Sequence, residues 1–397
     1  MKKQQLHSVA KIIAGQSPAS STYNSTGDGL PFFQGKADFQ EMYPRVRIWC
    51  TSDKRKEAEP GDILISVRAP VGAVNICNQK SIIGRGLSAI RPALNLDKLF
   101  LYYFLKANEQ QIDALGTGST FKAITQETLK KVEISLPPLD DQKRIAHLLG
   151  KVEGLIARRK HHLQQLDDLL KSVFLEMFGD PVRNEKGWKA VFWDDLFVTR
   201  TGKLNANAMS ENGAYPFFTC AKEIFQIDNF VFDCEALILA GNNATGDYDV
   251  KHYKGKFNAY QRTYILELKS EADEYLFYKH HLEMKLRQLK DGSKGANTRY
   301  LTKQFLDTIS FIQPHEKLQN QFAAIVEKVK GIKSRYQQSL TDLESLYGAL
   351  SQKAFKGELD LSQVSLPVEP TKEDTDSTEE LNREIREQRE SKTGVAV

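Results

Sequence analysis

The sequence predicts an α+β protein in which two similar mixed α/β domains are separated by two long helices. Three observations predict this architecture. The chain has 397 residues, which is too long for one ordinary domain. Two long stretches carry apolar residues in alternating steps of three and four, and the segments that precede them share an ordered similarity. We expect the helices to pair as an antiparallel coiled coil, with the domains related by a pseudo-two-fold axis.

The two long helices form the clearest part of the repeat, and their stretches begin at Leu136 and Ile312. Adding 177 to each apolar position of the first helix gives an apolar residue in the second. Steps of three and four are the a and d spacing of a coiled coil. A helix of about 38 residues is about 57 Å long and cannot bury such a seam alone. The predicted seam consists of Ile145, Leu148, Val152, Leu155, Leu166, Leu169 and Val173, with Phe322, Ile325, Val329, Ile332, Leu343, Leu346 and Leu350.

Both helices are predicted to start just after a proline, Pro138 in the first and Pro314 in the second. Counted from these prolines, the second start has one more residue before Gln319 than the first has before Gln142. We therefore expect the repeat to be imperfect where the helices begin.

The apolar pattern is interrupted at the same place in both helices, by Arg159 and His162 in the first and by Tyr336 and Ser339 in the second. The run 158–162 is basic, and a solvated helix face is its simplest interpretation. Contact with DNA phosphates or with a partner subunit is the alternative. A polar residue at a seam position can also set the register of a coiled coil.

The segments before the long helices repeat in the same order. Each contains a short aromatic strand, two further apolar strands, a helical stretch, a Gly/Ser loop and a last strand. The predicted organisation is a first globular domain at 1–140, a spacer helix at 141–178, a second globular domain at 179–315, a second spacer helix at 316–357 and a polar tail at 358–397.

The charge is unevenly distributed along the chain. The net charge is +4, yet the residues from Leu366 onward hold five Lys/Arg and nine Asp/Glu, so the remaining chain carries +8. The tail is predicted to be disordered. A charge of +8 is compatible with a nucleic-acid partner but is also common in other proteins.

Composition argues against a membrane or secreted protein. There is no apolar run of about 18 residues and no apolar segment typical of a secretory signal. The four cysteines form no CxxC pair and have no metal-ligand spacing with histidine. We expect a cytoplasmic protein with single thiols and no metal site.

No catalytic motif is found. The chain lacks a Gly-rich cofactor loop paired with an Asn/Asp-Pro-Pro-aromatic motif, and it lacks a P-loop. The sequence GTGSTF from Gly116 has no lysine and is interpreted as a turn. Asp141-Gln142-Lys143 has no strand context for a nuclease site, and His315 lacks the second histidine of a zinc protease. We therefore expect a non-catalytic chain without a cofactor of its own.

Several segments of the chain match those of a known family. They are PGDILISVRAPVGAVNI from Pro60, LPPLDDQKRIAHLL from Leu136, GKFNAYQRTYIL from Gly255 and LQNQFAAIVEKVKGI from Leu318, with the helix ends LEMFGD and KAFKGEL. The resemblance extends over residues 5–360 and is to the specificity subunits of type I restriction–modification enzymes. It implies two target-recognition domains that each read one half of a bipartite double-stranded DNA target, and spacer helices that set the gap and dock partners. It also implies two modification subunits, which transfer methyl from S-adenosylmethionine to adenine, and restriction subunits that use ATP.

Candidate DNA-binding residues follow from base-edge chemistry. Arginine and lysine match guanine, asparagine and glutamine match adenine, and hydroxyls and lysines contact phosphates. The alternative interpretation is ordinary turn residues and surface charges. The candidates are Arg68, Arg85, Arg91 and Lys122 in the first domain, and Asn242, Asn243, Lys256, Asn258, Tyr260, Gln261, Arg262, Lys294, Asn297, Arg299 and Tyr300 in the second.

Two other functions compete with a specificity subunit. A self-contained methyltransferase–nuclease would bind S-adenosylmethionine as an isolated chain. A DNA-independent coiled-coil scaffold would show no salt-dependent affinity for DNA, whereas a DNA-binding subunit loses affinity steeply with salt.

Overall fold

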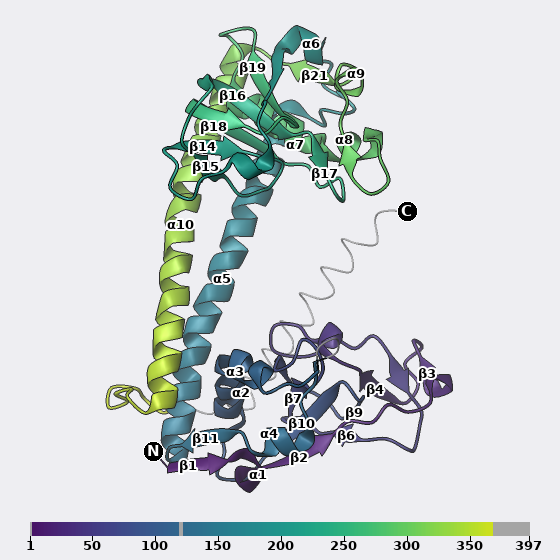
Figure 1. Cartoon of the computed structure of the whole chain (residues 1–397), viewed down its shortest axis with the longest axis vertical. Helices are drawn as coiled ribbons and strands as arrows, with labels where there is room; N and C mark the ends of the chain where they lie inside the picture. Colours follow the sequence, from purple (N-terminus) through teal and green to yellow (C-terminus); the bar gives the residue numbers. More distant parts are fainter. Residues whose placement is uncertain (1, 119–121, 368–397) are drawn as a thin grey trace. The chain divides into compact units, whose positions relative to one another are not determined.

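The computed structural model describes residues 2–118 and 122–367, and it separates into two compact units (Figure 1). Unit 1 comprises Met1–Ala157 and Thr341–Val397, and unit 2 comprises Arg158–Leu340. The division falls inside the two long helices, α5 (Leu139–Phe178) and α10 (Glu316–Lys356), so each unit holds part of both. The predicted domain boundaries and the pseudo-two-fold relation stay predictions. Most of the predicted tail lies outside the described residues.

Unit 1 is built on a four-stranded sheet with the order β2 (Ala10–Ala14), β10 (Leu87–Pro92), β7 (Ile63–Ser66), β8 (Val74–Ile76). A second sheet has the order β3 (Tyr23–Asn24), β5 (Trp49–Cys50), β4 (Leu30–Phe33), β9 (Ser81–Ile83), β6 (Glu57–Ala58). The strand β1 (Lys2–Gln5) pairs antiparallel with β11 (Glu133–Leu136). The helices are α1 (Leu6–Val9), α2 (Lys98–Ala107), α3 (Glu109–Ala114) and α4 (Gln126–Lys130), with short 3-10 turns at Ser20–Thr22 and Lys36–Asp38.

Unit 2 is built on a six-stranded sheet with the order β13 (Phe197–Thr201), β19 (Thr263–Leu268), β16 (Phe232–Ala240), β18 (Val250–Ala259), β14 (Tyr215–Phe218), β15 (Phe225–Ile227). Two further antiparallel pairs are β12 (Lys189–Phe192) with β21 (Ser310–Gln313), and β17 (Asn242–Asn243) with β20 (Arg299–Tyr300). The helices are α6 (Trp193–Leu196), α7 (Tyr275–Met284), α8 (Leu286–Gly292) and α9 (Lys303–Leu306), with a 3-10 turn at Ala206–Ala208.

The two units have the same internal topology, which confirms the predicted repeat. The order β2-β10-β7-β8 in unit 1 matches β13-β19-β16-β18 in unit 2. In each unit an aromatic strand adds in parallel, with Phe32 opposite Ile82 and Phe217 opposite Asn258. The short aromatic strands that the repeat predicts, here Leu30–Phe33 and Tyr215–Phe218, are therefore equivalent.

A buried glutamine fixes the start of each long helix. Gln142 accepts a hydrogen bond from the backbone N–H of Asp97 (2.8 Å) and donates to the carbonyl of Pro137 (2.9 Å). Gln319 accepts from the N–H of Glu274 (3.0 Å) and donates to the carbonyl of Pro314 (2.9 Å). Each glutamine side chain therefore links a long helix to the residue that directly precedes α2 in unit 1 or α7 in unit 2.

These bonds correct one expectation from the sequence. Pro314 is equivalent to Pro137 and not to Pro138, because each carbonyl accepts from the glutamine five residues later. The repeat therefore continues without an inserted residue through both helix starts, and the helices begin 177 residues apart, at Leu139 and Glu316.

We expect Gln319→Ala to lower the free energy of unfolding by about 1–3 kcal/mol, because it leaves the half-buried N–H of Glu274 and the buried carbonyl of Pro314 without their hydrogen-bond partner. Thermal unfolding monitored by circular dichroism measures the change. Gln321→Ala, on the same helix but exposed, is the matched control and should change stability little. Equal melting temperatures for both variants would contradict a structural role for the buried amide.

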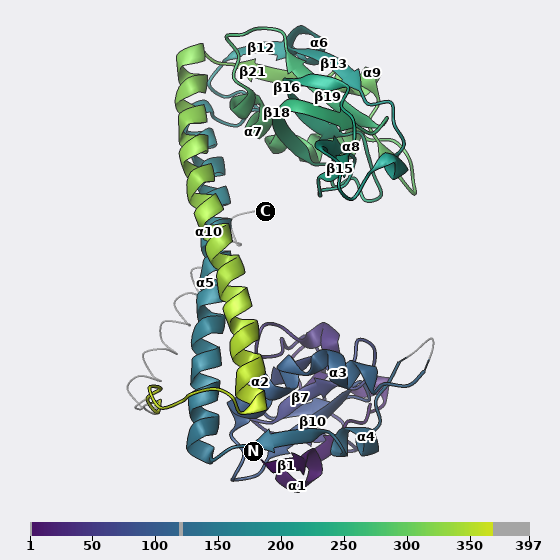
Figure 2. The ribbon, with the colours of Figure 1, turned by 60° about the vertical axis from the view of Figure 1, so that its left-hand side comes forward.

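The long helices pack antiparallel within each unit, and Figures 1 and 2 show them side by side. In unit 1 the first turns of α5 and the last turns of α10 share one core, with Ile145 and Leu149 in the same cluster as Ala354. In unit 2 the end of α5 meets the start of α10, where the rings of Phe174 and Phe322 lie 5.4 Å apart. The predicted pairing of the helices is confirmed.

The register of the seam differs from the prediction. In both helices the buried or half-buried seam positions again follow one another in steps of three and four. Each seam position in α5 has its equivalent 177 residues later in α10. They are Gln142, Ile145, Leu149, Val152, Ile156, Arg159, Leu163, Leu166, Leu170, Val173 and Met177 in α5, and Gln319, Phe322, Val326, Val329, Lys333, Tyr336, Leu340, Leu343, Tyr347, Leu350 and Ala354 in α10.

Eight of the fourteen predicted seam residues belong to this set, and the other six lie beside it. Leu155, Leu169, Ile332 and Leu346 are 47%, 48%, 41% and 46% exposed, so their assignment to the seam was wrong. Leu148 and Ile325 also lie one position off the seam and are half-buried. The physical reason is that apolar residues are adjacent in pairs such as Leu155-Ile156 and Leu169-Leu170, so the spacing alone fits either register. We call Leu155, Leu169, Ile332 and Leu346 the outer stripe.

The predicted polar interruption of the seam is an aromatic–cationic contact in unit 2. The guanidinium of Arg159 lies 4.2 Å from the centre of the Tyr336 ring. The ring of His162 meets the same tyrosine edge-on at 5.7 Å. A cation over an aromatic face is attracted by the ring quadrupole, so this polar layer stabilises the seam.

The core of unit 2 contains a fully buried histidine, His281, on α7. Its Nε2 accepts a hydrogen bond from the N–H of Ile312 (3.0 Å), so the ring is neutral in the folded protein. Burial, followed by the charge of Lys285, holds the pKa of His281 well below its ordinary value of 6.5. In the unfolded chain this histidine takes up a proton near pH 6.5, which the folded state cannot do.

The unfolded state therefore binds more protons below pH 6.5, and stability is expected to fall as the pH drops from 7.5 to 5. The contribution of one such group is at most about 1.4 kcal/mol per pH unit. Chemical denaturation at both pH values measures it. His281→Gln retains an acceptor without the titration and should lose less stability over the same interval. If this variant lost as much stability as the unmodified protein between pH 7.5 and 5, His281 would not be the source of the pH dependence.

Candidate nucleic-acid interface

Most of the predicted DNA-binding residues lie on three segments of each unit, and equivalent backbone hydrogen bonds join these segments in both units. In unit 2 the N–H of Gly241 donates to the carbonyl of Arg262, and the N–H of Leu301 donates to the carbonyl of Gly241 (both 2.8 Å). In unit 1 the N–H of Val67 donates to Gly86 (2.9 Å), and the N–H of Ile124 donates to Val67 (3.0 Å). Each unit thus brings three parts of the chain to one place. They are the end of a strand, a tight turn, and the loop that precedes α4 in unit 1 or α9 in unit 2, which we call the late loop.

In unit 2 the late loop pairs directly with the strand end. Asn242 lies opposite Tyr300 and Asn243 opposite Arg299 in a short antiparallel pair, and Lys294 forms a bridge to Tyr300. The structure therefore brings together two sequence segments that were proposed independently. We call Asn242, Asn243, Tyr260, Gln261, Arg262, Lys294, Asn297, Arg299 and Tyr300 the unit 2 recognition cluster.

Unit 1 has the matching arrangement. Arg68 forms a bridge to Ala123, which also pairs with Thr117. Arg85 directly precedes Gly86 in the turn. We call Arg68, Arg85 and Lys122 the unit 1 recognition cluster; residues 119–121 of the same loop lie outside the described part.

One cation in each cluster holds its loop against the preceding helix. Lys122 forms an ion pair with Asp113 at the end of α3 (2.6 Å). Its equivalent, Arg299, donates to the carbonyl of Lys290 in α8 (3.0 Å). Arg299 lies 177 residues after Lys122, and Lys290 lies 177 residues after Asp113. These side chains shape the loop, so their role is positional.

Two predicted residues have structural roles instead. The guanidinium of Arg91 makes two 2.8 Å hydrogen bonds to the carboxylate of Asp62, whose side chain is only 2% exposed. Asn258 is 2% exposed and donates to Asn229 (3.0 Å). Because their hydrogen-bonding groups are already used inside the fold, neither is suited to read a base.

The remaining candidates are at the surface. Arg68, Arg85, Gln261, Arg262, Lys294 and Asn297 are exposed, and Tyr300 is 39% exposed. Asn243 closes its own turn by accepting from the N–H groups of Thr245 (2.9 Å) and Asp247 (3.2 Å). Lys256 is exposed too, and its ammonium lies over the ring of Phe230 (4.7 Å).

The sequence did not indicate two polar neighbours of the turns. The hydroxyl of Ser17 accepts from the N–H of Arg85 (3.2 Å). The side chain of Asn205 accepts from the amide of Gln261 (3.2 Å). Both follow the first strand of their sheet, and only the non-local strand pairing brings them to the turn.

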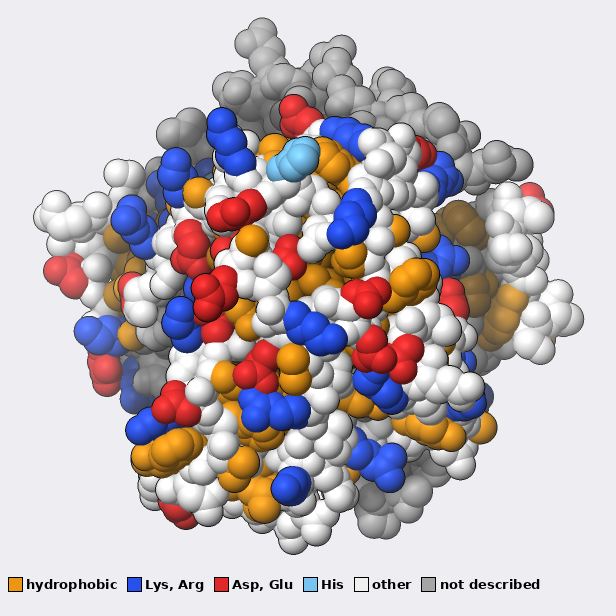
Figure 3. All heavy atoms as spheres, turned by 90° about the horizontal axis from the view of Figure 1, so that it is seen from above, with side chains coloured by type: hydrophobic (Ala, Val, Ile, Leu, Met, Phe, Trp, Pro, Cys, Tyr) orange, Lys and Arg blue, Asp and Glu red, His pale blue; other side chains and the backbone are white. Residues whose placement is uncertain are grey.

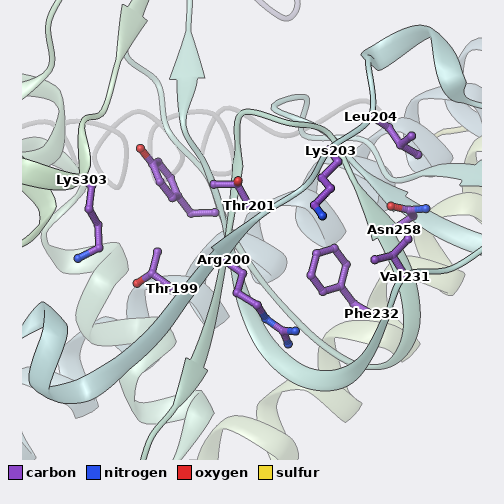
Figure 4. Close-up of a pocket in the computed structure, with 10 residues that line it drawn as sticks. Thr199, Arg200, Thr201, Lys203, Leu204, Val231, Phe232, Asn258 and Lys303 are labelled. Carbon is purple, nitrogen blue, oxygen red and sulfur yellow. The ribbon is translucent and has the colours of Figure 1, made fainter.

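A pocket of about 760 Å³ adjoins the unit 2 cluster, since its lining residue Leu204 accepts from the N–H of Gln261 (2.9 Å). Figure 4 shows Arg200, Lys203 and Phe232 at this opening. Arg200 lies over the Phe232 ring (5.1 Å) and pairs with Glu267, and Lys303 pairs with Asp194 and Asp307. Most of the positive charge at the pocket is therefore balanced by nearby carboxylates.

The location of the unit 2 cluster is visible in the ribbon views. Figures 1 and 2 show α8 on the side of unit 2 that is remote from the long helices, and Figure 1 shows β17 beside it. The face drawn in Figure 3 carries Lys/Arg and Asp/Glu side chains intermixed, without a gathering of one sign. Among the described residues, no helix is long and apolar enough to span a bilayer, and no cluster of three His, Cys, Asp or Glu residues is arranged to bind a metal.

Comparison with known proteins identifies the family. The profile described as "Type I restriction modification DNA specificity domain" matches residues 1–167 and 185–342. The chain is 44% identical over 174 residues to a protein named as the type I restriction enzyme MjaX specificity subunit of Methanocaldococcus jannaschii, covering 44% of this chain and 41% of that protein. It is 36% identical over 176 residues to the EcoDI specificity subunit of Escherichia coli, covering 43% of this chain and 38% of that protein. The matches thus span about two fifths of the length of these relatives.

A solved structure supports the fold over most of the chain. The S subunit of a type I restriction–modification system from M. genitalium matches with a TM-score of 0.61 and 18% identity, covering 89% of this chain and 96% of that one. The profile match, in two parts, covers the globular part of both units. The chain therefore belongs to the family of type I restriction–modification DNA specificity proteins.

Proposed function

We propose that the chain is the sequence-specific DNA-recognition subunit of a type I restriction–modification complex. Each unit reads one half of a bipartite double-stranded target through its recognition cluster, and the paired helices set the gap. The observation that carries the proposal is the equivalence of the two clusters. A strand end, a turn and a late loop meet through the same backbone hydrogen bonds in both units.

The residue types of the clusters suit this role. Exposed arginine, asparagine and glutamine side chains can form the paired hydrogen bonds that distinguish base edges in the major groove. Lysine and tyrosine side chains at the same place can contact phosphates. The anchoring contacts of Lys122 and Arg299 hold each loop in one conformation, which limits the entropy lost on binding.

The outer stripe supports docking of partner subunits on the long helices. Leu155 and Leu346 in unit 1, and Leu169 and Ile332 in unit 2, are each more than 40% exposed and adjoin the helix seam. Exposed apolar residues aligned along a helix pair are typical of a surface that receives another helix. Two modification subunits, one for each unit, are the proposed occupants.

In this proposal the chain itself is non-catalytic and has no cofactor. The modification subunits use S-adenosylmethionine to methylate adenine, and the restriction subunits that join the complex use ATP. The proposed location is the cytoplasm, where such a complex meets cellular DNA.

The test is to map methylated adenines by single-molecule sequencing in cells that carry the chain with its modification subunit, and in cells that lack only the chain. Methylation at a two-part motif with a fixed gap should disappear without the chain. Unchanged methylation, together with no binding to DNA or to a modification subunit, would favour a coiled-coil scaffold.

Salt dependence separates the proposed function from the scaffold alternative. If the proposed function is right, the assembled complex should lose DNA affinity steeply as salt rises, with a slope in a double-logarithmic plot of about −0.9 for each phosphate contact. A scaffold would show no such dependence.

A further inference from the structure

The two recognition clusters carry different residue types at equivalent backbone positions. The first position directly follows the strand residue that donates to the turn, and it is Arg68 in unit 1 and Asn242 in unit 2. Both pair with the late loop, Arg68 with Ala123 and Asn242 with Tyr300, and these partners are 177 residues apart.

The second position directly precedes the turn carbonyl that accepts this bond. It is Arg85 before Gly86 in unit 1 and Gln261 before Arg262 in unit 2. Both are held by a polar neighbour, because the N–H of Arg85 donates to Ser17 and the side chain of Gln261 donates to Asn205. Unit 1 therefore has arginine at both positions, and unit 2 has an amide at both.

The side chains are available for a ligand. Arg68 and Arg85 are exposed, and neither guanidinium forms an ion pair with any residue that the structure describes. Asn242 is half-buried and its side-chain amide has no hydrogen bond within the described ranges. Gln261 uses one N–H for Asn205 and keeps its second N–H and its carbonyl oxygen.

The geometry of base edges separates these two sets. The guanidinium fork matches the O6 and N7 acceptors of guanine, whereas a side-chain amide offers one donor and one acceptor to the N7 and N6 of adenine. We infer that the half-site read by unit 1 contains guanines contacted by Arg68 and Arg85, and that the half-site read by unit 2 contains adenines contacted by Asn242 and Gln261. This inference rests on the proposed function.

Arg262 does not enter the comparison, because its equivalent is Gly86, which has no side chain. Only the equivalent positions Arg68 and Asn242, and Arg85 and Gln261, are compared. The half-site of unit 2 can hold a guanine elsewhere.

The experiment uses the complex of the chain with its modification subunits and labelled duplexes that carry the methylated motif. Each base pair of both half-sites is replaced in turn, and affinity is measured by competition. In the half-site of unit 1, replacing a contacted guanine by adenine should weaken binding by roughly 5- to 150-fold. The double variant Arg68→Asn with Arg85→Gln should lose this preference and favour adenine there, with base preference in the other half-site unchanged.

Lys122→Ala is the control variant. It loosens the loop anchor and should lower affinity without changing which base is preferred. The inference is overturned if the half-site affected by the double variant contains no guanine, or if the guanine preference persists in that variant. Failure of the proposed function looks different, because no two-part motif would then depend on the chain at all.

Discussion

Replacing Arg68 and Arg85 together by alanine is expected to weaken binding of the assembled complex to its target by about 30-fold to about 20,000-fold. Each arginine that pairs with a base contributes about 1–3 kcal/mol, and 1.4 kcal/mol corresponds to a factor of ten. The loss should be confined to one half-site, because both residues belong to the unit 1 cluster. Fluorescence anisotropy with duplexes in which either half-site is scrambled measures it.

The fold should survive this change, since both side chains are exposed and lack ion pairs within the described part of the chain. Arg183→Ala is the matched control, because Arg183 is also a surface arginine, with a side chain 75% exposed and no place in either cluster. It should leave target affinity within about twofold, as expected for a surface site outside the interface. If the double variant lost the same affinity for the duplex with the first half-site scrambled as for the duplex with the second half-site scrambled, Arg68 and Arg85 would not act on one half-site alone.

The second large effect is expected at the outer stripe. Ile332→Glu should weaken association with the modification subunit by about 30- to 700-fold, as for removal of a central apolar contact from an interface. The physical reason is that a carboxylate would be buried without a partner where isoleucine now offers an apolar surface. Analytical ultracentrifugation of the mixed subunits measures the association.

Stability of the isolated chain should change by no more than about 0.5 kcal/mol, because Ile332 is 41% exposed. Lys328→Glu is the control: this residue lies one turn earlier on α10, is exposed and is not part of the stripe. A normal complex with the Ile332 variant, or an equal loss with the Lys328 variant, would refute docking on the stripe.

The overall architecture was predictable because its signals are local or repeated. The apolar spacing of both helices, the paired aromatic strands and the order of elements recur along the chain, and the structure bears them out. The seam register was not predictable to one position. Leu155-Ile156 and Leu169-Leu170 each offer two apolar neighbours, and only packing against the second helix decides which one is buried.

The candidate site was predictable in position but not in role. Arg91 looks like a surface arginine in sequence, and its pairing with Asp62, 29 residues earlier in the chain, depends on the pairing of β10 with β7. The anchoring of Lys122 by Asp113 and of Arg299 by the carbonyl of Lys290 depends on how each late loop folds back on its helix. Ser17 and Asn205 lie in polar loops without a motif and join the clusters only through tertiary contacts.

In the proposed function, the unit 2 cluster reads one half of the target independently of unit 1. The most direct measurement is the methylation map of cells that express the triple variant Asn242→Ala, Gln261→Ala, Arg262→Ala with its modification subunit. We predict a motif in which one half becomes degenerate while the other half and the gap length are unchanged. Degeneracy in both halves, or a changed gap with both halves intact, would contradict the account.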